Sequence, residues 1–272
     1  MNTELCKNRR AAHNQLCVCT ASSGEDGEGG ESIVQLEFDW QGPPPEAGQF
    51  FMLRPERTSA FLGRPFSAAG WTRAGAGGLH LRFLVARRGK ATAELCSLRP
   101  GERVELSGPL GRGWQQGARD AGLSLEGPLA LVAGGLGIAP LAALASELDA
   151  RRAGAGPVYD LYAGFRDKPF GIAGLKPRSL VTAVEAGSEG RRGFVTDFFS
   201  PAGRGAVLTC GPLPMMRIVA AACREAGIPC LVSMETRMAC GVGACLGCTI
   251  RTRDGHARCC TEGPVFDARI AI

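Results

Sequence analysis

The chain has 272 residues, of which 45% are hydrophobic and 21% charged, and its formal net charge is +5. This composition is ordinary for a globular protein of one to three domains, and the scattered Lys and Arg residues do not indicate a nucleic-acid surface. No apolar run reaches the roughly 20 residues that span a bilayer, and the first 25 residues lack the apolar core of a secretory signal. We therefore expect a cytoplasmic protein, in which twelve cysteines favour metal or redox roles over disulfides.

Residues 15 to 107 have the pattern of short β-strands. Five segments mix β-branched and aromatic residues with alternation, and Gly, Pro and Asp turns separate them. These segments are 15–19, 33–40, 48–54, 79–87 and 102–108. Several short strands at close intervals predict a β-barrel or a sandwich. The acidic, glycine-rich run 22–32 predicts a flexible loop.

Within this zone the segment "GRPFSAAG" at 63–70 carries a candidate phosphate contact. Arg64 offers a planar fork of donors that suits phosphate, Ser67 adds a hydroxyl, and Pro65 keeps the segment extended. Taken alone, the pattern is equally typical of an Arg-Pro turn on a protein surface.

From 129 to 231 the pattern changes to alternating strands and helices. Continuous apolar runs predict strands, and longer periodic segments between them predict helices. The expected strands are 129–133, 157–165, 179–187 and 205–210, and the expected helices are 140–154 and 214–227. Buried strands that alternate with helices predict a parallel sheet.

Two turns of this zone are candidate nucleotide contacts. Gly134, Gly135 and Gly137 follow the first strand and would let a pyrophosphate approach the backbone and the positive end of the next helix. Pro140 takes the position of the third glycine of G-x-G-x-x-G, where the first helical turn tolerates it. Cys210 closes a later strand, at the sheet edge where α/β folds bind ligands. An ordinary strand-to-helix turn and a buried structural cysteine are the alternatives.

The last 42 residues are rich in glycine and cysteine. Cys240, Cys245 and Cys248 have the C-x4-C-x2-C spacing of plant-type 2Fe–2S ligands. Gly241, Gly243 and Gly247 would let this loop wrap tightly around a cluster and aim N–H groups at the sulfurs. Zinc sites usually have two C-x2-C pairs, and only one is present here.

A fourth thiolate is available after a predicted hairpin. Asp254-Gly255 is a strong turn signal, so the chain can return to Cys259 or Cys260. Neighbouring residues of a strand point to opposite faces, so only one of this pair should be a ligand. The spacing leaves both cysteines open.

In chain order, "RPFS", "GGLGIAP", "CGPLPMM" and the cysteine loop resemble the ferredoxin–NADP reductase superfamily with a fused 2Fe–2S tail. "METRMACGVGACLGC" followed by "CCTEGPVF" is most similar to electron-transfer subunits of type B dihydroorotate dehydrogenase. The resemblance implies a FAD-binding β-barrel domain over 1–125, an NAD-binding α/β domain over 126–230 and a 2Fe–2S domain over 231–272. It also implies the ligand choice: the family's fourth cysteine precedes x-x-Gly-Pro, which selects Cys260.

The same resemblance implies the cofactor contacts. The residues that would bind FAD are Arg64, Pro65, Phe66 and Ser67, followed by Leu84, Val85, Ala86, Ala91 and Thr92, where the match is looser. The glycine turn together with Cys210, Gly211 and Pro212 would form the nicotinamide dinucleotide site, with Cys210 as the catalytic residue. NAD and NADP stay open, because Asp160 lies within the second strand of the sheet and Arg166 beyond it could meet a 2′-phosphate.

The implied function is electron transfer. A nicotinamide exchanges a hydride, a cluster exchanges single electrons, and flavin does both, so FAD belongs between them. The implied partner is an FMN-containing subunit that oxidises dihydroorotate to orotate, in an assembly of two plus two subunits. The alternatives are the same module with another partner (a hydrogenase, a sulfite reductase or a ferredoxin:NADP transhydrogenase) and a non-catalytic, metal-stabilised binding module.

Overall fold

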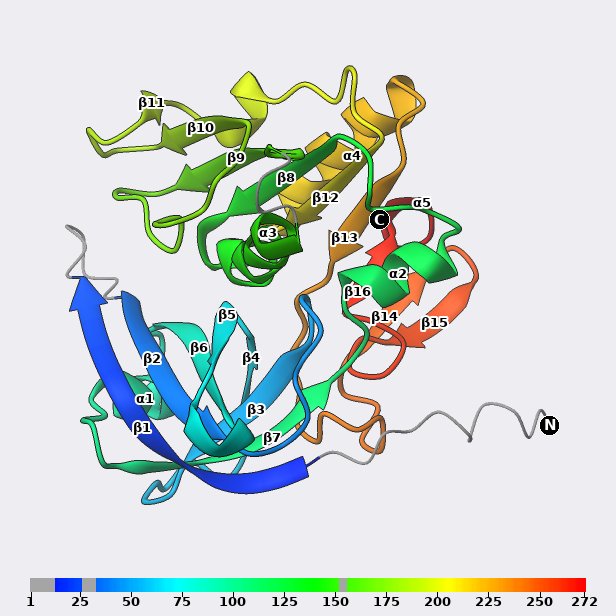
Figure 1. Ribbon diagram of the computed structural model, residues 1–272. Helices are drawn as coiled ribbons and strands as arrows, with labels where there is room; N and C mark the ends of the chain where they lie inside the picture. Colours follow the sequence, from blue (N-terminus) through cyan, green and yellow to red (C-terminus); the bar gives the residue numbers. More distant parts are fainter. Residues whose placement is uncertain (1–12, 26–32, 152–155) are drawn as a thin grey trace.

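The computed structural model describes residues 13–25, 33–151 and 156–272. Figure 1 shows a curled sheet in blue and cyan below a second sheet in green and yellow, with the orange and red C-terminal segment beside both. Two seven-stranded sheets and one two-stranded hairpin make up the β-structure of these residues.

The first sheet is antiparallel, with strand order β4-β3-β7-β1-β2-β6-β5. Its strands are β1 (His13–Glu25), β2 (Ile33–Trp40), β3 (Phe50–Pro55), β4 (Arg64–Ser67), β5 (Gly70–Arg73), β6 (Leu79–Ala86) and β7 (Arg103–Leu110). Every second residue of β2 is buried, which places Leu36, Phe38 and Trp40 in the core of the curled sheet. The short elements η2 (Gly75–Gly77), α1 (Lys90–Cys96) and α2 (Trp114–Asp120) join or follow these strands.

All five predicted strands of this zone are confirmed, but two expectations need correction. The two edge strands, β4 and β5, do not pair with each other in the described residues, so the predicted barrel is a curled, open sheet. Residues 22–25 of the predicted loop continue β1, because their backbone groups bond to residues 33–36 of β2. The rest of that loop, 26–32, lies outside the described residues.

The second sheet has the order β11-β10-β9-β8-β12-β13-β16, and all its neighbours are parallel except β13 and β16. Its strands are β8 (Leu129–Gly134), β9 (Tyr159–Phe165), β10 (Ser179–Val184), β11 (Arg191–Arg192), β12 (Ala206–Cys210), β13 (Cys230–Ser233) and β16 (Val265–Asp267). The helical elements are η3 (Gly135–Gly137), α3 (Ile138–Arg151), η4 (Val195–Phe198), α4 (Leu213–Glu225) and α5 (Ala268–Ala271). The predicted parallel sheet is therefore confirmed over β8 to β13.

Helices cover both faces of this sheet, which explains why its central strand is apolar throughout. Leu129 and Leu131 of β8 belong to the same buried cluster as Leu141 of α3. Ala130 and Val132, which point to the other face, belong to the cluster that contains α4.

The C-terminal segment starts and finishes in the second sheet. β13 begins at Cys230, so the predicted boundary at 230/231 falls inside this strand, and β16 returns to pair with it. Between them, β14 (Thr249–Thr252) and β15 (Gly255–Arg258) form the predicted hairpin. The turn is Arg253–Asp254, and Gly255 already belongs to β15.

The cysteine loop packs against the curled sheet. Phe50, Met52 and Leu110 share one buried cluster with Cys248 and Cys260. This packing brings the loop next to β3, the strand that pairs with β4.

Candidate cofactor cleft and cysteine loop

A cleft of about 820 Å³ lies between the two sheets. Its lining comes from β4, β6 and α1 on one side and from η3, α3 and the end of β12 on the other, with residues after β13 completing it. Small-molecule and cofactor sites commonly measure roughly 300–1,000 Å³. The cleft is therefore large enough for part of a dinucleotide, and it lies at the carboxyl ends of β8 and β12.

The four residues of β4 all line this cleft. β4 is an edge strand, where a proline such as Pro65 removes no needed ladder bond. Arg64 donates to the carbonyl oxygen of Leu62 at 2.8 Å, which holds the guanidinium near its own loop. Phe66 packs partly against the core of the curled sheet, so Arg64 and Ser67 supply the polar groups of this wall.

The predicted flavin contacts for which the family match is looser lie partly in the cleft wall and partly in the core of the curled sheet. Leu84 and Ala86 line the cleft, whereas Val85 between them is fully buried in the curled sheet. Ala91 is buried in α1. Thr92 lines the cleft, and its hydroxyl accepts from the backbone N–H of Gly89 at 2.9 Å, which stabilises the start of the helix.

The two glycine-containing turns pack against each other. A Cβ on Gly137 would lie 2.1 Å from the carbonyl oxygen of Cys210, and a Cβ on Gly211 would lie 2.9 Å from the Cα of Gly134. A Cβ on Gly134 would lie 2.7 Å from the Cδ of Pro212. These glycines are thus required by contact between two strand ends. Gly135 differs, because its φ of +53° favours glycine and its Cβ position faces open space.

Cys210 lies in the cleft wall, at the end of β12. Burial raises the pKa of its thiol to about 12, the Glu235 carboxylate acts in the same direction, and the Ser233 hydroxyl opposes them. The thiol is therefore protonated at neutral pH. In this form it can contact a bound ring or donate a weak hydrogen bond.

The four predicted ligand cysteines form two pairs. The backbone N–H of Cys245 donates to the Sγ of Cys240 at 3.4 Å, and that of Cys260 donates to the Sγ of Cys248 at 3.4 Å. Burial and the Cys248 thiol raise the pKa of Cys260 to about 12, and the charge of Cys240 adds to this effect. The two pairs thus lie within electrostatic reach of each other.

Backbone donors surround the first pair. Burial raises the pKa of the Cys240 thiol, but hydrogen bonds from the backbone N–H groups of Cys245, Val242 and Ala244 outweigh burial and lower it to about 6. Cys240 is therefore largely a thiolate at neutral pH, the form that binds metals. Among the residues that the structure describes, no group of three or more His, Cys, Asp or Glu side chains is arranged to hold one metal ion.

Only two of the three glycines of the cysteine loop have a backbone conformation that favours glycine. Gly241 and Gly243 have φ values of +70° and +79°, and a Cβ on Gly241 would lie 2.9 Å from Leu110. Gly247 has no positive φ, and a Cβ there would make only an ordinary contact, 3.6 Å from the Sγ of Cys245. Leu246 adopts a φ of +58° instead, which no residue pattern indicated.

Cys259 and Cys260 do not lie on a strand, because β15 ends at Arg258 and a turn follows. Their hydrogen-bond partners nevertheless differ. The Cys259 thiol donates to the carbonyl oxygen of Met234 at 3.2 Å, whereas Cys260 is the neighbour of Cys248. Both cysteines are buried.

Residues 233–238, the last residue of β13 and the segment after it, line the cleft and were not predicted as part of the site. They connect the sheet to the cysteine loop and include Glu235, whose charge raises the pKa of the Cys210 thiol. The run "METRM" directly before the cysteines could have indicated them, because it connects the predicted nucleotide domain to the cysteine loop.

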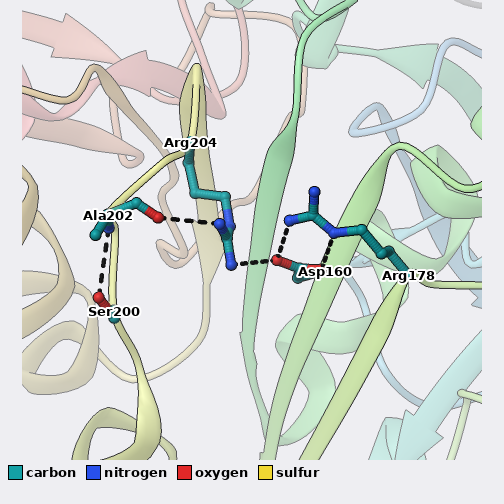
Figure 2. Close-up of polar contacts among 5 residues, drawn as sticks. All are labelled: Asp160, Arg178, Ser200, Ala202 and Arg204. Carbon is teal, nitrogen blue, oxygen red and sulfur yellow. Dashed lines mark hydrogen bonds and ion pairs between the residues drawn. The ribbon is translucent and has the colours of Figure 1, made fainter.

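Asp160 is a structural residue, as Figure 2 shows. It lies near the amino end of β9 and is 1% exposed. Arg178 donates to its carboxylate at 2.7 and 2.9 Å, and Arg204 forms a second ion pair with it. The carboxyl ends of the parallel strands lie at the opposite edge of the sheet, so Asp160 cannot reach a ribose there. Arg166 is exposed just beyond β9, at the cofactor edge.

Residues 235–270 match the family model described as the iron-sulfur cluster binding domain of dihydroorotate dehydrogenase B. Three curated relatives are each named as the electron transfer subunit of dihydroorotate dehydrogenase B (NAD(+)). The protein of Clostridium acetobutylicum is 37% identical over 80% of this chain and 83% of its own length. That of Clostridium perfringens is 38% identical over 81% and 85%, and that of Caldanaerobacter subterraneus subsp. tengcongensis is 33% identical over 86% and 90%.

Solved structures show the same fold. An NADH-dependent reduced ferredoxin-NADP oxidoreductase superposes with a TM-score of 0.70 and 23% identity, over 94% of this chain and 90% of that chain. An Amycolatopsis cytochrome P450 reductase gives a TM-score of 0.58 and 28% identity, over 79% of this chain and 67% of that chain. The arrangement of a curled antiparallel sheet and a largely parallel sheet is thus that of ferredoxin–NADP reductases.

Proposed function

The chain belongs to the family of electron transfer subunits of NAD(+)-dependent dihydroorotate dehydrogenase B, and from this membership we propose that it relays electrons from a dihydroorotate-oxidising partner to NAD+. The relay uses a 2Fe–2S cluster and FAD, both held by this chain. The feature that carries the proposal is the position of Cys248 and Cys260, packed against Phe50 and Met52 of β3 beside the cleft.

The four cysteines fit a binuclear cluster better than one metal ion. A 2Fe–2S cluster takes four thiolates, two on each iron, and the described chain offers two pairs. A zinc site would need three or four ligands around one point. We therefore assign Cys240, Cys245, Cys248 and Cys260 as the ligands. The N–H groups around Cys240 would stabilise the negative charge of the cluster.

The β4 side of the cleft suits a flavin nucleotide. Arg64 would bind the pyrophosphate with its fork of donors, and Ser67 would supply a hydroxyl beside it. Phe66, Leu84 and Ala86 would provide apolar contacts, with Pro65, Val85, Ala91 and Thr92 shaping the wall through their backbone. When bound, FAD supplies the interchange between hydride and single-electron chemistry.

The opposite side suits the nicotinamide dinucleotide. Gly135 would let a phosphate approach the turn after β8, and the packed turns at Gly134, Gly137, Gly211 and Pro212 would hold that edge rigid. Cys210 would contact the nicotinamide, and its protonated thiol would leave the charge of the ring unchanged. Such a contact would make Cys210 a catalytic residue that orients the ring.

The partner would be the FMN-containing subunit that oxidises dihydroorotate to orotate, in a cytoplasmic assembly of two plus two subunits. Cys245 is exposed, and the apolar side chains of Val242 and Leu246 beside it are 42% and 60% exposed. This surface is suitable for docking a partner over the cluster. None of the helices in residues 13–25, 33–151 and 156–272 combines the length and apolar character that crossing a bilayer requires.

The alternative partners use the same module, and the reductase with a TM-score of 0.70 shares its fold. The curated relatives favour dihydroorotate oxidation. A decisive experiment is anaerobic purification with quantified iron, sulfide and flavin, followed by co-purification with an FMN subunit that binds orotate. Two irons and one FAD per chain, with dihydroorotate-dependent reduction of NAD+, are expected. A colourless protein that contains zinc would contradict the proposal.

A further inference from the structure

Cys259 is a fully buried cysteine that is not one of the four proposed cluster ligands. It lies in the buried cluster shared by Phe50 and Met52 of the curled sheet and by Cys248 and Cys260 of the cysteine loop. Its thiol donates to the carbonyl oxygen of Met234 at 3.2 Å. The thiol is therefore hydrogen-bonded to a residue that lines the cofactor cleft.

The main chain of Cys259 is tied to the proposed ligands. Its N–H donates to the carbonyl oxygen of Cys248 at 3.1 Å, and the next N–H, that of Cys260, donates to the Sγ of Cys248. Cys259 thus joins the two strands of the hairpin at the point where two ligands meet. A shift of this residue would move both ligands of the second pair.

The side chain of Cys259, in contrast, contacts residues that line the cleft. Met234 and Thr236 both line the cleft. The backbone of Met234 is also held by Pro264, because the N–H of Met234 donates to the carbonyl oxygen of Pro264 at 2.8 Å. The Cys259 thiol provides a hydrogen-bond donor for the carbonyl oxygen of Met234. The hydroxyl of Thr236 is buried without a hydrogen-bond partner of normal geometry among the described residues, and it lies within reach of the same sulfur.

We propose that Cys259 is a positioning residue, whose thiol fixes the wall of the flavin cleft at 234–236 against the hairpin that carries Cys248 and Cys260. This inference rests on the proposed function, since it concerns how the two cofactor sites are held together. Groups next to metal ligands orient those ligands and influence the reduction potential of a metal centre. Loss of the thiol should therefore change the properties of the cluster without removing it.

The test compares three substitutions in the full-length protein with FAD and cluster in place. Cys259→Ala and Cys259→Val remove the donor, and valine keeps most of the volume. Cys259→Ser keeps a donor for the Met234 carbonyl. Cys223→Ala is the matched control, because Cys223 is also fully buried but belongs to the core around α4, away from the loop.

Four quantities are measured: iron and flavin per chain, the electron paramagnetic resonance spectrum of the reduced cluster, its midpoint potential, and the rate at which NADH reduces it. We expect full iron and flavin content in all variants. Alanine and valine should shift the spectrum and the midpoint potential, because the hydrogen bonding around the cluster changes, and should slow its reduction by NADH. Serine should restore all three to values close to those of the native protein.

Two results would overturn the inference. If alanine and valine match the native protein and Cys223→Ala in all four quantities, the thiol positions nothing. If the serine variant loses iron together with alanine and valine, Cys259 is itself a ligand and the assignment of Cys260 is wrong. Failure of the proposed function is distinguishable, because the native protein would then contain no iron–sulfur cluster at all.

Discussion

The backbone N–H of Cys260 donates to the Sγ of Cys248 at 3.4 Å, across a separation of 12 residues in the chain. The hairpin β14–β15 spans most of that separation and brings its two ends together. The proposed third and fourth ligands therefore meet because the intervening residues form a short, closed hairpin.

The first prediction concerns the exposed ligand. Cys245→Ser should abolish dihydroorotate:NAD activity of the assembled enzyme while NADH still reduces FAD in this chain, because the cleft does not include Cys245. The loss should exceed the roughly 100-fold that changes around metal ligands can cause. Steady-state turnover and stopped-flow flavin reduction measure the two activities. A variant with full dihydroorotate:NAD activity would rule out the relay.

The second prediction concerns Gly137. Gly137→Ala places a Cβ 2.1 Å from the Cys210 carbonyl oxygen, so the two turns must separate. The free energy of unfolding should fall by about 3 kcal/mol, as overpacking at a rigid contact does, and affinity for NADH should fall with it. Gly127→Ala, where nothing lies within 4 Å, is the control and should change stability by less than about 0.5 kcal/mol. Denaturant titration and NADH binding check both effects.

The third prediction concerns Asp160. Asp160→Asn leaves the guanidinium of Arg204, which is only 18% exposed, without its buried carboxylate. The free energy of unfolding should fall by about 3 kcal/mol, because one partner of a buried pair is removed. The KM for NADH should stay unchanged, since Asp160 lies at the amino end of β9. A selective rise in KM with normal stability would instead place Asp160 at the ribose.

The fourth prediction is a dependence of stability on pH. The Cys210 thiol has a pKa of about 12 in the folded chain, against about 8.5 for an unperturbed cysteine. Above about pH 9 the unfolded chain has lost this proton and the folded chain still holds it, so stability falls as pH rises. Each such thiol contributes a slope of about 1.4 kcal/mol per pH unit up to the folded pKa.

Cys210→Ala removes this contribution, so its unfolding free energy should depend less steeply on pH between about 9 and 11. Denaturant midpoints across that range measure the difference. Equal slopes for the variant and the native chain would show that the thiol is not buried as described. Cys223→Ala provides a control for the loss of one buried thiol elsewhere.

Local features of the sequence predicted local structure well. Alternation located β2 and β6, continuous apolar runs located β8, β9 and β12, and a Gly-containing turn signal located the β14–β15 hairpin. The sequence-based prediction failed where the structure of a segment depends on contacts with residues distant in the chain. Residues 22–25 look like a loop until β2 lies beside them. The segment 233–238 is held in the cleft wall through hydrogen bonds of Met234 with the distant residues Cys259 and Pro264.

The main strands and helices, the C-x4-C-x2-C spacing and the chemistry that this spacing allows could all be predicted from the sequence alone, because backbone periodicity and ligand spacing are local properties. In contrast, it is contacts across the fold that place another strand end against Gly134 and Gly137, two arginines on Asp160, and different hydrogen-bond partners on Cys259 and Cys260. Each of these depends on contacts between residues distant in the chain, which no local pattern encodes.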